Sequence, residues 1–309
     1  MARREHRSLV LLCILLLAVT VCTMVSADAG EKGDLEKRRF TVFVSILPQK
    51  YVVQQIGRPY TDVHVLVQPG DSPATYSPTP RQLSNLGQAK IFFRIGVPFE
   101  KAWVAKAQRS TKDLAVVDLR RNIELRHFNR LEAAEDAGQD AEKQTESGKD
   151  PHTWLDPRLV KKQTETVYQA LAEQDPDHRE IYRRNYREFA ERLDQLHNTL
   201  KETLKPVDGK KMFVFHPAFG YFADAYGLTQ VPIELQGKSP SPRELNTIIQ
   251  KAREEGIQTI FVQKQFSERS ARTIARALDG EVVVLNPLPE HYIEGMKRMG
   301  RKIAEALKK

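Results

Sequence analysis

The sequence predicts an α/β protein made of two α/β lobes with parallel sheets, joined by one long rigid linker helix. Two series of short β-rich segments alternate with helix-compatible segments, an arrangement typical of parallel sheets with short crossovers. A long amphipathic helical stretch separates the two series. The chain has 309 residues, of which 40% are hydrophobic and 28% charged. This length suggests about two domains, and the composition excludes a wholly disordered or fibrous protein.

The first series begins at residues 40–46 (FTVFVSI), a run rich in β-branched and aromatic side chains. We assign residues 40–157 to an N-terminal lobe. Its other strands are expected at 63–67, 90–94 and 115–117, and its helices at 49–56, 79–88 and 99–107.

The second series begins at residues 212–215 (MFVF), and we assign residues 207–309 to a C-terminal lobe. Its other strands are expected at 231–234, 259–262 and 281–285, and its helices at 241–255, 267–278 and 290–307. Each lobe thus alternates strands and helices, as a parallel sheet requires.

A helical linker is predicted over residues 158–206, and its main part is one long helix. Large apolar residues recur there at intervals of three and four, which predicts an amphipathic helix that packs along one face. Asp177 is a possible cap at its start, and Pro206 ends it. About 27 residues at 1.5 Å each give ~40 Å, long enough to run along both lobes. The apolar series is Tyr182, Tyr186, Phe189, Leu193, Leu196, Leu200 and Leu204.

The amino terminus has the features of a secretory signal over residues 1–27. Three arginines precede an apolar run, and small residues follow it at Ser26-Ala27. A charged leader at 28–39 would then precede the first lobe. A retained amino-terminal anchor and a lipoprotein attached at Cys22 are the alternatives, although the large Val21 before this cysteine disfavours the second. A periplasmic or otherwise extracytoplasmic location is therefore expected.

The charge pattern indicates no polyanionic partner. The net charge is +8, and loss of residues 1–27 removes three Arg and one Glu, which leaves about +6. Lys and Arg alternate with Glu along the helices, and no basic stripe with aromatic residues is present, so we expect no nucleic-acid binding. Segment 132–150 carries seven acidic residues and two lysines, and we interpret it as a mobile, solvated acidic loop.

Histidines are the remaining candidates for soft metal ligands. The only cysteines, Cys13 and Cys22, lie in the signal region, so the body has no disulfide, no Cys-based zinc site and no cysteine nucleophile. Ligands in open α/β sheets bind beyond the carboxyl ends of the strands. The polar residues at predicted strand ends are Arg94, His216, Gln263 and Asn286, and His152 lies where the acidic loop ends.

Six motifs, spread in order along the chain, resemble those of the zinc/manganese family of ABC-transporter solute-binding proteins. The resemblance runs from about Phe40 to the carboxyl terminus. It implies two lobes joined by a rigid helix, capture of a divalent metal between them, and delivery to a membrane permease. The motifs are PGDSPATYSPTP (69–80), KDPHTWLDP (149–157), HPAFGY (216–221), GKSPSP (237–242), IFVQKQFS (260–267) and LNPL (285–288).

The resemblance implies that His152 and His216 are metal ligands. It also implies that a histidine at the position of His216 goes with zinc, whereas a carboxylate there goes with manganese. Three positions depart from the family pattern. Ala74 stands where the family has its first histidine, Asn286 stands where an aspartate is common, and Gln263 stands where a glutamate is common. Zn²⁺ is the expected metal, with Mn²⁺ or Fe²⁺ as possibilities.

Three explanations of these departures remain open. The first is a rearranged metal site, completed by water, by the amides at 263 and 286, or by a carboxylate such as Asp71 or Asp150, because two imidazoles leave a tetrahedral zinc half coordinated. The second is a cleft for an anion or a chelated metal, with Arg94 as the counter-charge and Tyr76 as a further cleft residue. The third is a ligand-free accessory protein on the same scaffold.

We expect no enzymatic activity. His152, Asp156 and His216 could be imagined as a metal hydrolase, but amides stand at the strand ends where a general base would be needed. No nucleophile elbow, phosphate loop or dinucleotide fingerprint is present. A monomer is expected. Metal binding by two imidazoles should weaken below about pH 6, because their ordinary pKa is about 6.5.

Overall fold

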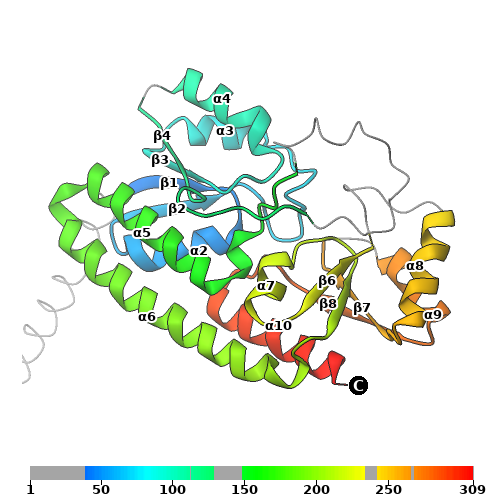
Figure 1. The fold of residues 1–309 in the computed structure, drawn as a ribbon. Helices are drawn as coiled ribbons and strands as arrows, with labels where there is room; N and C mark the ends of the chain where they lie inside the picture. The colour runs from blue at the N-terminus through cyan, green and yellow to red at the C-terminus, as the bar shows by residue number, and fades with distance from the viewer. Residues whose placement is uncertain (1–38, 112, 129–147, 234–241, 266–267, 309) are drawn as a thin grey trace, which may run out of the picture.

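The structure is a computed structural model, and it describes residues 39–111, 113–128, 148–233, 242–265 and 268–308. The predicted signal (1–27), the charged leader and nearly all of the acidic loop (132–150) lie outside the described residues. The described part contains two parallel four-stranded sheets with helices on their faces, as predicted (Figure 1). We call the part around the first sheet the first lobe and the part around the second sheet the second lobe.

The first sheet has the strand order β2-β1-β3-β4, and all neighbouring strands are parallel. Its observed strands agree with the predicted ones to within two residues at each end. The elements of this lobe are β1 (Phe40–Val44), α2 (Leu47–Gly57), β2 (Thr61–Val65), α3 (Pro80–Leu86), β3 (Ile91–Arg94), α4 (Glu100–Ser110) and β4 (Ala115–Asp118).

The second sheet repeats the same topology with the order β6-β5-β7-β8, again entirely parallel. Strand β7 is buried along its whole length, which explains the uninterrupted apolar run Ile-Phe-Val at its centre. The elements are β5 (Lys211–Val214), α7 (Gly220–Ala225), β6 (Thr229–Pro232), α8 (Pro242–Glu254), β7 (Thr259–Gln263), α9 (Glu268–Ala277), β8 (Glu281–Leu285) and α10 (Tyr292–Leu307).

Helices α5 (Pro157–Gln174) and α6 (Arg179–Leu204) connect the two lobes. Helix α6 has 26 residues and extends beside both lobes, as the periodicity predicts (Figure 1). The predicted cap at Asp177 is wrong. A short 3₁₀ turn, Pro176–His178, precedes α6, and the carboxylate that organises this turn belongs to Asp175, which binds the His178 ring and the Tyr182 hydroxyl.

One apolar core is shared by the two lobes. Buried residues of the first sheet, of α5 and α6, and of α10 form a single contiguous cluster that also includes Met212 and Val214 of β5. A smaller separate cluster lies under α8 and α9. Because apolar burial at this junction is continuous, the lobes are held together by packing as well as by the connecting helices.

Asn185 fastens α6 to the first lobe. Its side-chain amide is buried and donates hydrogen bonds to the carbonyl oxygens of Ile56 (3.0 Å) and Arg58 (2.9 Å), just where α2 ends. We expect Asn185→Ala to lower the free energy of unfolding by about 2 kcal/mol, because it leaves these two carbonyl groups without this donor. Asn198→Ala, at an exposed position of the same helix, is the matched control in urea denaturation. Equal stabilities of the two variants would contradict the prediction.

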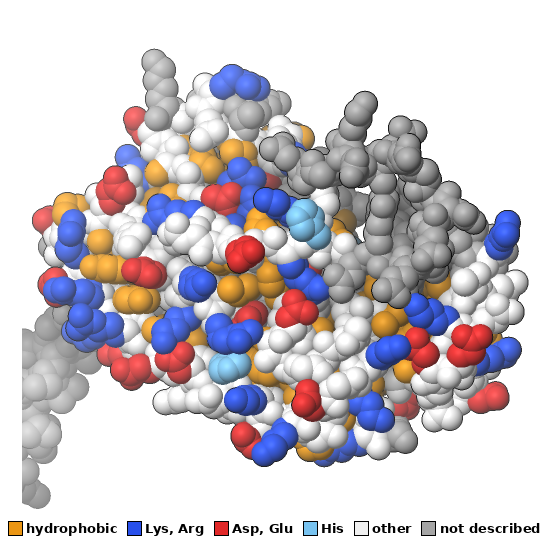
Figure 2. Space-filling model, in the orientation of Figure 1, with side chains coloured by type: hydrophobic (Ala, Val, Ile, Leu, Met, Phe, Trp, Pro, Cys, Tyr) orange, Lys and Arg blue, Asp and Glu red, His pale blue; other side chains and the backbone are white. Residues whose placement is uncertain are grey.

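The described surface carries mixed charge. Lys and Arg side chains are interspersed with Asp and Glu over the visible face (Figure 2). Among the helices of the described ranges, none combines the length and the apolar character needed to cross a membrane.

Candidate metal site

His152, which lies just before α5, and His216, which follows β5, are in ring contact where the two lobes meet. Their ring centroids are 5.4 Å apart, and the ring planes are inclined by 73°. A tetrahedral zinc with Zn–N bonds of about 2.0–2.1 Å would place two imidazole centroids about 5 Å apart. The separation therefore suits two imidazoles that share one ion.

His152 is placed by a turn that is anchored to the second lobe. It precedes a 3₁₀ turn, Thr153–Leu155, whose Trp154 is only 2% exposed. The indole Nε1 of Trp154 donates to the carbonyl oxygen of Pro287 (2.8 Å), and the hydroxyl of Tyr292 donates to the Trp154 carbonyl oxygen (2.7 Å). Both partners belong to the second lobe, so they fix the turn that carries His152.

His216 follows β5, and the side chain of Gln263 holds its backbone. The Gln263 Oε1 accepts from the His216 backbone N–H (3.2 Å), and the Gln263 Nε2 donates to the His216 carbonyl oxygen (2.5 Å). Gln263 is fully buried at the end of β7. Its amide thus positions His216, and one of the two lone pairs of its oxygen is already used by the first of these bonds.

The other predicted site residues have different surroundings. The Asn286 Oδ1 accepts from the Leu288 backbone N–H (3.1 Å) and so shapes the turn after β8. The Tyr76 hydroxyl donates to the Leu66 carbonyl oxygen, and its ring packs edge-on against Phe99. Asp71 and Ala74 are exposed in the loop after β2.

A polar pocket of about 420 Å³ lies in this loop and is open to solvent. Asp71 and Tyr76 line it together with hydroxyl and amide side chains, and neither His152 nor His216 is among its lining residues. In the described residues no group of three or more His, Cys, Asp or Glu side chains is arranged to hold a metal ion. The geometry therefore brings together the two histidines and does not add Asp71 to them.

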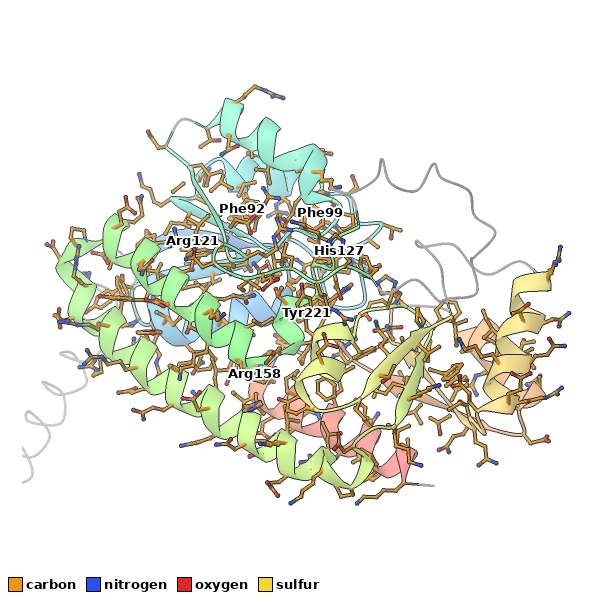
Figure 3. All side chains as sticks on the ribbon, viewed as in Figure 1. Phe92, Phe99, Arg121, His127, Arg158 and Tyr221 are labelled. Atoms are coloured by element: carbon orange, nitrogen blue, oxygen red, sulfur yellow. The ribbon has the colours of Figure 1, made fainter. Side chains whose placement is uncertain are left out.

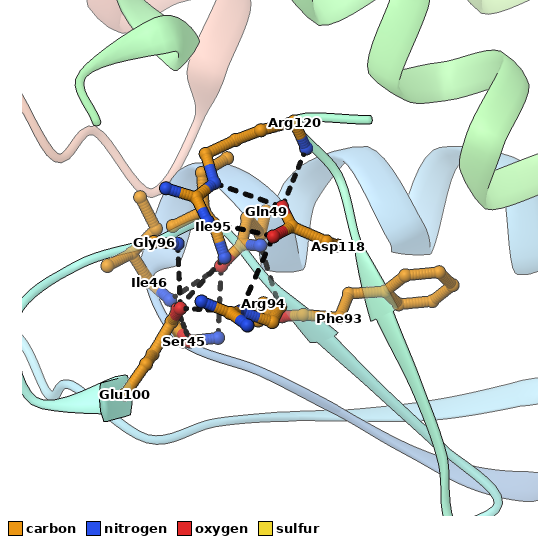
Figure 4. A network of polar contacts seen from close by, with 10 residues as sticks. All are labelled: Ser45, Ile46, Gln49, Phe93, Arg94, Ile95, Gly96, Glu100, Asp118 and Arg120. Carbon is orange, nitrogen blue, oxygen red and sulfur yellow. Dashed lines mark hydrogen bonds and ion pairs between the residues drawn. The ribbon is translucent and has the colours of Figure 1, made fainter. Parts of the chain in front are cut away.

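Arg94 belongs to a buried polar network at the carboxyl ends of the first sheet (Figure 4). The centre of the network is Glu100, whose carboxylate is fully buried. It accepts hydrogen bonds from the Ser45 hydroxyl (2.5 Å) and from the backbone N–H groups of Ile95 (2.9 Å) and Gly96 (2.6 Å). The Arg94 Nε lies 3.4 Å from this carboxylate.

Arg94 also approaches a second carboxylate. Its Nε lies 3.6 Å from Asp118 Oδ2, and Arg120 pairs with the same carboxylate at 2.8 Å. Hydrogen bonds from Arg120 hold the pKa of Asp118 below its ordinary value despite the opposing effect of burial. The charge of Arg94 is thus compensated by Glu100 and Asp118, which leaves it a weak counter-charge for a bound anion.

Glu100 makes stability depend on pH. Burial raises its pKa above the ordinary 4.5, against the opposing hydrogen bonds and the charge of Arg94. The folded state therefore binds the proton more tightly than the unfolded state, so this contribution is complete below pH 4.5 and is lost as the pH rises through the folded-state pKa. Relative to the always-neutral Glu100→Gln, the wild-type free energy of unfolding should fall as the pH rises from 4.5 through the folded-state pKa of Glu100. A pH-independent difference in urea denaturation would contradict this.

The electrostatics around His152 favour a neutral ring. Burial lowers the pKa of His152 below 6.5, Asp150 opposes this shift, and His216 adds to it. The ring is also enclosed by aromatic neighbours, with Trp154 at 5.0 Å and Phe128 at 6.1 Å between centroids. A neutral imidazole is the form that binds a metal.

Three residues around His152 have roles that the sequence does not predict. Asp150 is among the carboxylates that could complete a metal site, but in the structure its carboxylate binds the His152 ring. No sequence motif singles out Arg126 or the hydroxyl of Tyr221, yet this hydroxyl joins the backbones of Arg126 and Asp150. Figure 3 shows Tyr221 close to the segment of His127, where the lobes meet. Only the contact between Asp150 and His152 has a signal in the sequence, because the two residues are two positions apart in the motif Asp-Pro-His.

Comparison with known proteins identifies the family. The family model described as "ZnuA: Zinc-uptake complex component A periplasmic" matches residues 42–306. A crystal structure of ZnuA has 35% sequence identity and a TM-score of 0.79, with coverage of 87% of this chain and 99% of that one. A zinc-bound ZnuA variant lacking its residues 138–173 has a TM-score of 0.78 at 35% identity, with coverage of 88% and 99%.

Relatives with either metal in their names match almost the full chain. The high-affinity zinc uptake system protein ZnuA of Bacillus subtilis is 28% identical over 280 residues, covering 89% of this chain and 86% of the relative. The manganese ABC transporter substrate-binding lipoprotein PsaA of Streptococcus anginosus is 25% identical over 319 residues, covering 96% and 98%. These relatives are substrate-binding proteins and not enzymes. The chain belongs to the zinc/manganese family of metal-binding, substrate-binding proteins of ABC transporters.

Proposed function

We propose that this protein captures Zn²⁺ outside the cytoplasm and delivers it to the permease of an ABC importer. The observation that carries the proposal is the pair of imidazoles, His152 and His216, with centroids 5.4 Å apart at the junction of the lobes. Imidazole suits zinc, whereas manganese prefers carboxylate and carbonyl oxygens. Export by the amino-terminal signal, and action as a monomer, are parts of the same proposal.

Water or an exogenous ligand would complete the coordination beside these two nitrogens. Gln263 and Asn286 are already engaged with backbone groups, and the side chain of Ala74 offers no donor atom. An anion site centred on Arg94 is less well supported, because Glu100 and Asp118 already compensate this charge.

Metal analysis of the purified protein and calorimetric titration with Zn²⁺, Mn²⁺ and Fe²⁺ test the proposal. We expect one zinc per chain and an affinity for zinc at least about tenfold above that for manganese, since the two identified donors are nitrogen atoms. Tighter binding of manganese would overturn the choice of metal. Absence of metal binding, together with thermal stabilisation by an anion, would overturn the function.

A further inference from the structure

The acidic residue two positions before His152 makes contacts that a simple surface carboxylate would not. Asp150 is fully buried, with 0% of its surface exposed. Its Oδ1 lies 2.7 Å from Nδ1 of His152 and also accepts from the His152 backbone N–H at 2.9 Å. Two bonds from one carboxylate oxygen therefore hold both the backbone and the ring of the same histidine.

These contacts determine which ring nitrogen carries the proton. An ionised carboxylate only accepts hydrogen bonds, so Nδ1 of a neutral His152 must be the protonated nitrogen. The lone pair is then on Nε2, for which the described part of the chain provides no hydrogen bond. Histidines that bind metals commonly use this arrangement, in which a carboxylate fixes the tautomer and raises the basicity of the coordinating nitrogen.

The second lobe holds Asp150 in this place. The Tyr221 hydroxyl donates to the Asp150 carbonyl oxygen (2.9 Å) and accepts from the Arg126 backbone N–H (3.0 Å). Burial raises the pKa of Tyr221 to about 12, so the hydroxyl remains a donor at neutral pH. Gly220, at the start of α7, adds to the close fit, because a Cβ there would lie 2.9 Å from the Asp150 Oδ2.

We propose that Asp150 is a positioning residue for metal capture, whose carboxylate binds Nδ1 of His152, leaves Nε2 as the metal donor and strengthens that donor by its charge. The inference rests on the proposed function of the His152–His216 pair. Asp150 thus acts on the metal only through its contacts with His152 and is not itself a ligand. It also explains how a histidine packed among aromatic rings is held in one orientation at the lobe junction.

Three variants separate this role from a general structural one. Asp150→Ala removes both the hydrogen bonds and the charge, whereas Asp150→Asn keeps an oxygen at the same place and removes only the charge. Asp156→Ala is the matched control, because Asp156 is a buried aspartate of the same motif that caps α5 and binds Arg158 instead of a histidine. Circular dichroism confirms that each variant is folded before further measurement.

The readouts are the ¹⁵N NMR shifts of His152 in the metal-free protein and the zinc affinity by competition with a chromophoric chelator. Asp150→Ala should mix the two ring tautomers and weaken zinc binding by about 10- to 100-fold. Asp150→Asn should keep the Nδ1–H tautomer and weaken zinc binding by about tenfold. Asp156→Ala should lower the melting temperature and leave both readouts unchanged.

A folded Asp150→Ala protein with the wild-type tautomer and wild-type zinc affinity would overturn the proposal. If this variant does not fold, wild-type zinc affinity in Asp150→Asn would overturn it. Failure of the wild-type protein to bind zinc would instead reject the proposed function, and the tautomer comparison in metal-free protein would still decide whether Asp150 orients His152.

Discussion

Replacement of both histidines, His152→Ala with His216→Ala, should weaken zinc binding by about 1,000-fold or more, which is ~4 kcal/mol of binding free energy. In the proposed site each imidazole is one of the four ligands that a tetrahedral zinc needs. The nearby amides that could replace them are weak neutral donors already engaged with backbone groups. Calorimetric titration of the folded double variant measures the loss directly.

A second double variant, His64→Ala with His291→Ala, is the matched control for this result. It removes the same number of imidazoles from exposed positions, at which His64 contacts Asp62 and His291 precedes α10. We expect its zinc affinity to equal that of the wild type. Zinc binding by the His152/His216 variant at wild-type strength would show that the site lies elsewhere.

The same site predicts the direction of the pH dependence. Since burial lowers the pKa of His152 below its ordinary 6.5, the ring stays neutral and available for a metal at pH values where an exposed histidine would already be protonated. The stability gained by burying the neutral ring is therefore present above pH 6.5 and is lost as the pH falls through the folded-state pKa. Zinc affinity should therefore decline as the pH falls through the folded-state pKa of His152, and an affinity that stays constant as the pH falls well below 6.5 would contradict this.

Much of the fold could be predicted from sequence because its signals are local. The apolar residues of α6 recur at helical intervals, and the strands are short β-rich runs. The existence of two lobes followed from the interruption of the strand series by this helix. The error at Asp177 was equally local, because the neighbouring Asp175 offers the same carboxylate and only the backbone path of the 3₁₀ turn selects it.

The site could be predicted only in part, because roles there depend on contacts between distant segments. The pairing of His152 with His216 followed from motif and strand ends. Gln263 ends β7, and its side chain can contact the backbone of His216 because β5 and β7 are neighbours in the sheet. No pattern along the chain shows whether this amide faces that backbone or a bound ion. The role of Asp150 is equally hard to predict from sequence. Its carboxylate could bind a metal ion or could hold the ring of His152, and only the direction of the side chain decides between the two.

Loss of the Trp154 side chain should cause the largest loss of stability among single substitutions near the site. The indole is 2% exposed at the junction of the lobes, and its Nε1 donates to the Pro287 carbonyl oxygen at 2.8 Å. Trp154→Ala removes this packing and leaves the carbonyl without its donor, so we expect the free energy of unfolding to fall by about 4 kcal/mol. Urea denaturation followed by circular dichroism measures the change.

Two further substitutions separate packing from the hydrogen bond. Trp154→Phe keeps most of the apolar volume and loses the indole N–H, so it should cost about 1–3 kcal/mol. Trp103→Ala removes the other tryptophan of the chain, which is only partly buried on α4, and should cost less than Trp154→Ala. A loss below about 1 kcal/mol in Trp154→Ala would mean that this contact does not hold the lobes together.

The effect of Trp154→Ala should extend to metal binding. The indole ring lies 5.0 Å from the ring of His152, and the Tyr292 hydroxyl holds the Trp154 carbonyl oxygen at 2.7 Å. Without the indole, the turn that carries His152 loses the ring contact with the histidine and keeps the hydrogen bond from the Tyr292 hydroxyl. Zinc affinity should therefore fall in Trp154→Ala and be largely retained in Trp154→Phe, whose ring can still pack against the histidine. This order would show that the packing between the lobes also maintains the separation of the two imidazoles.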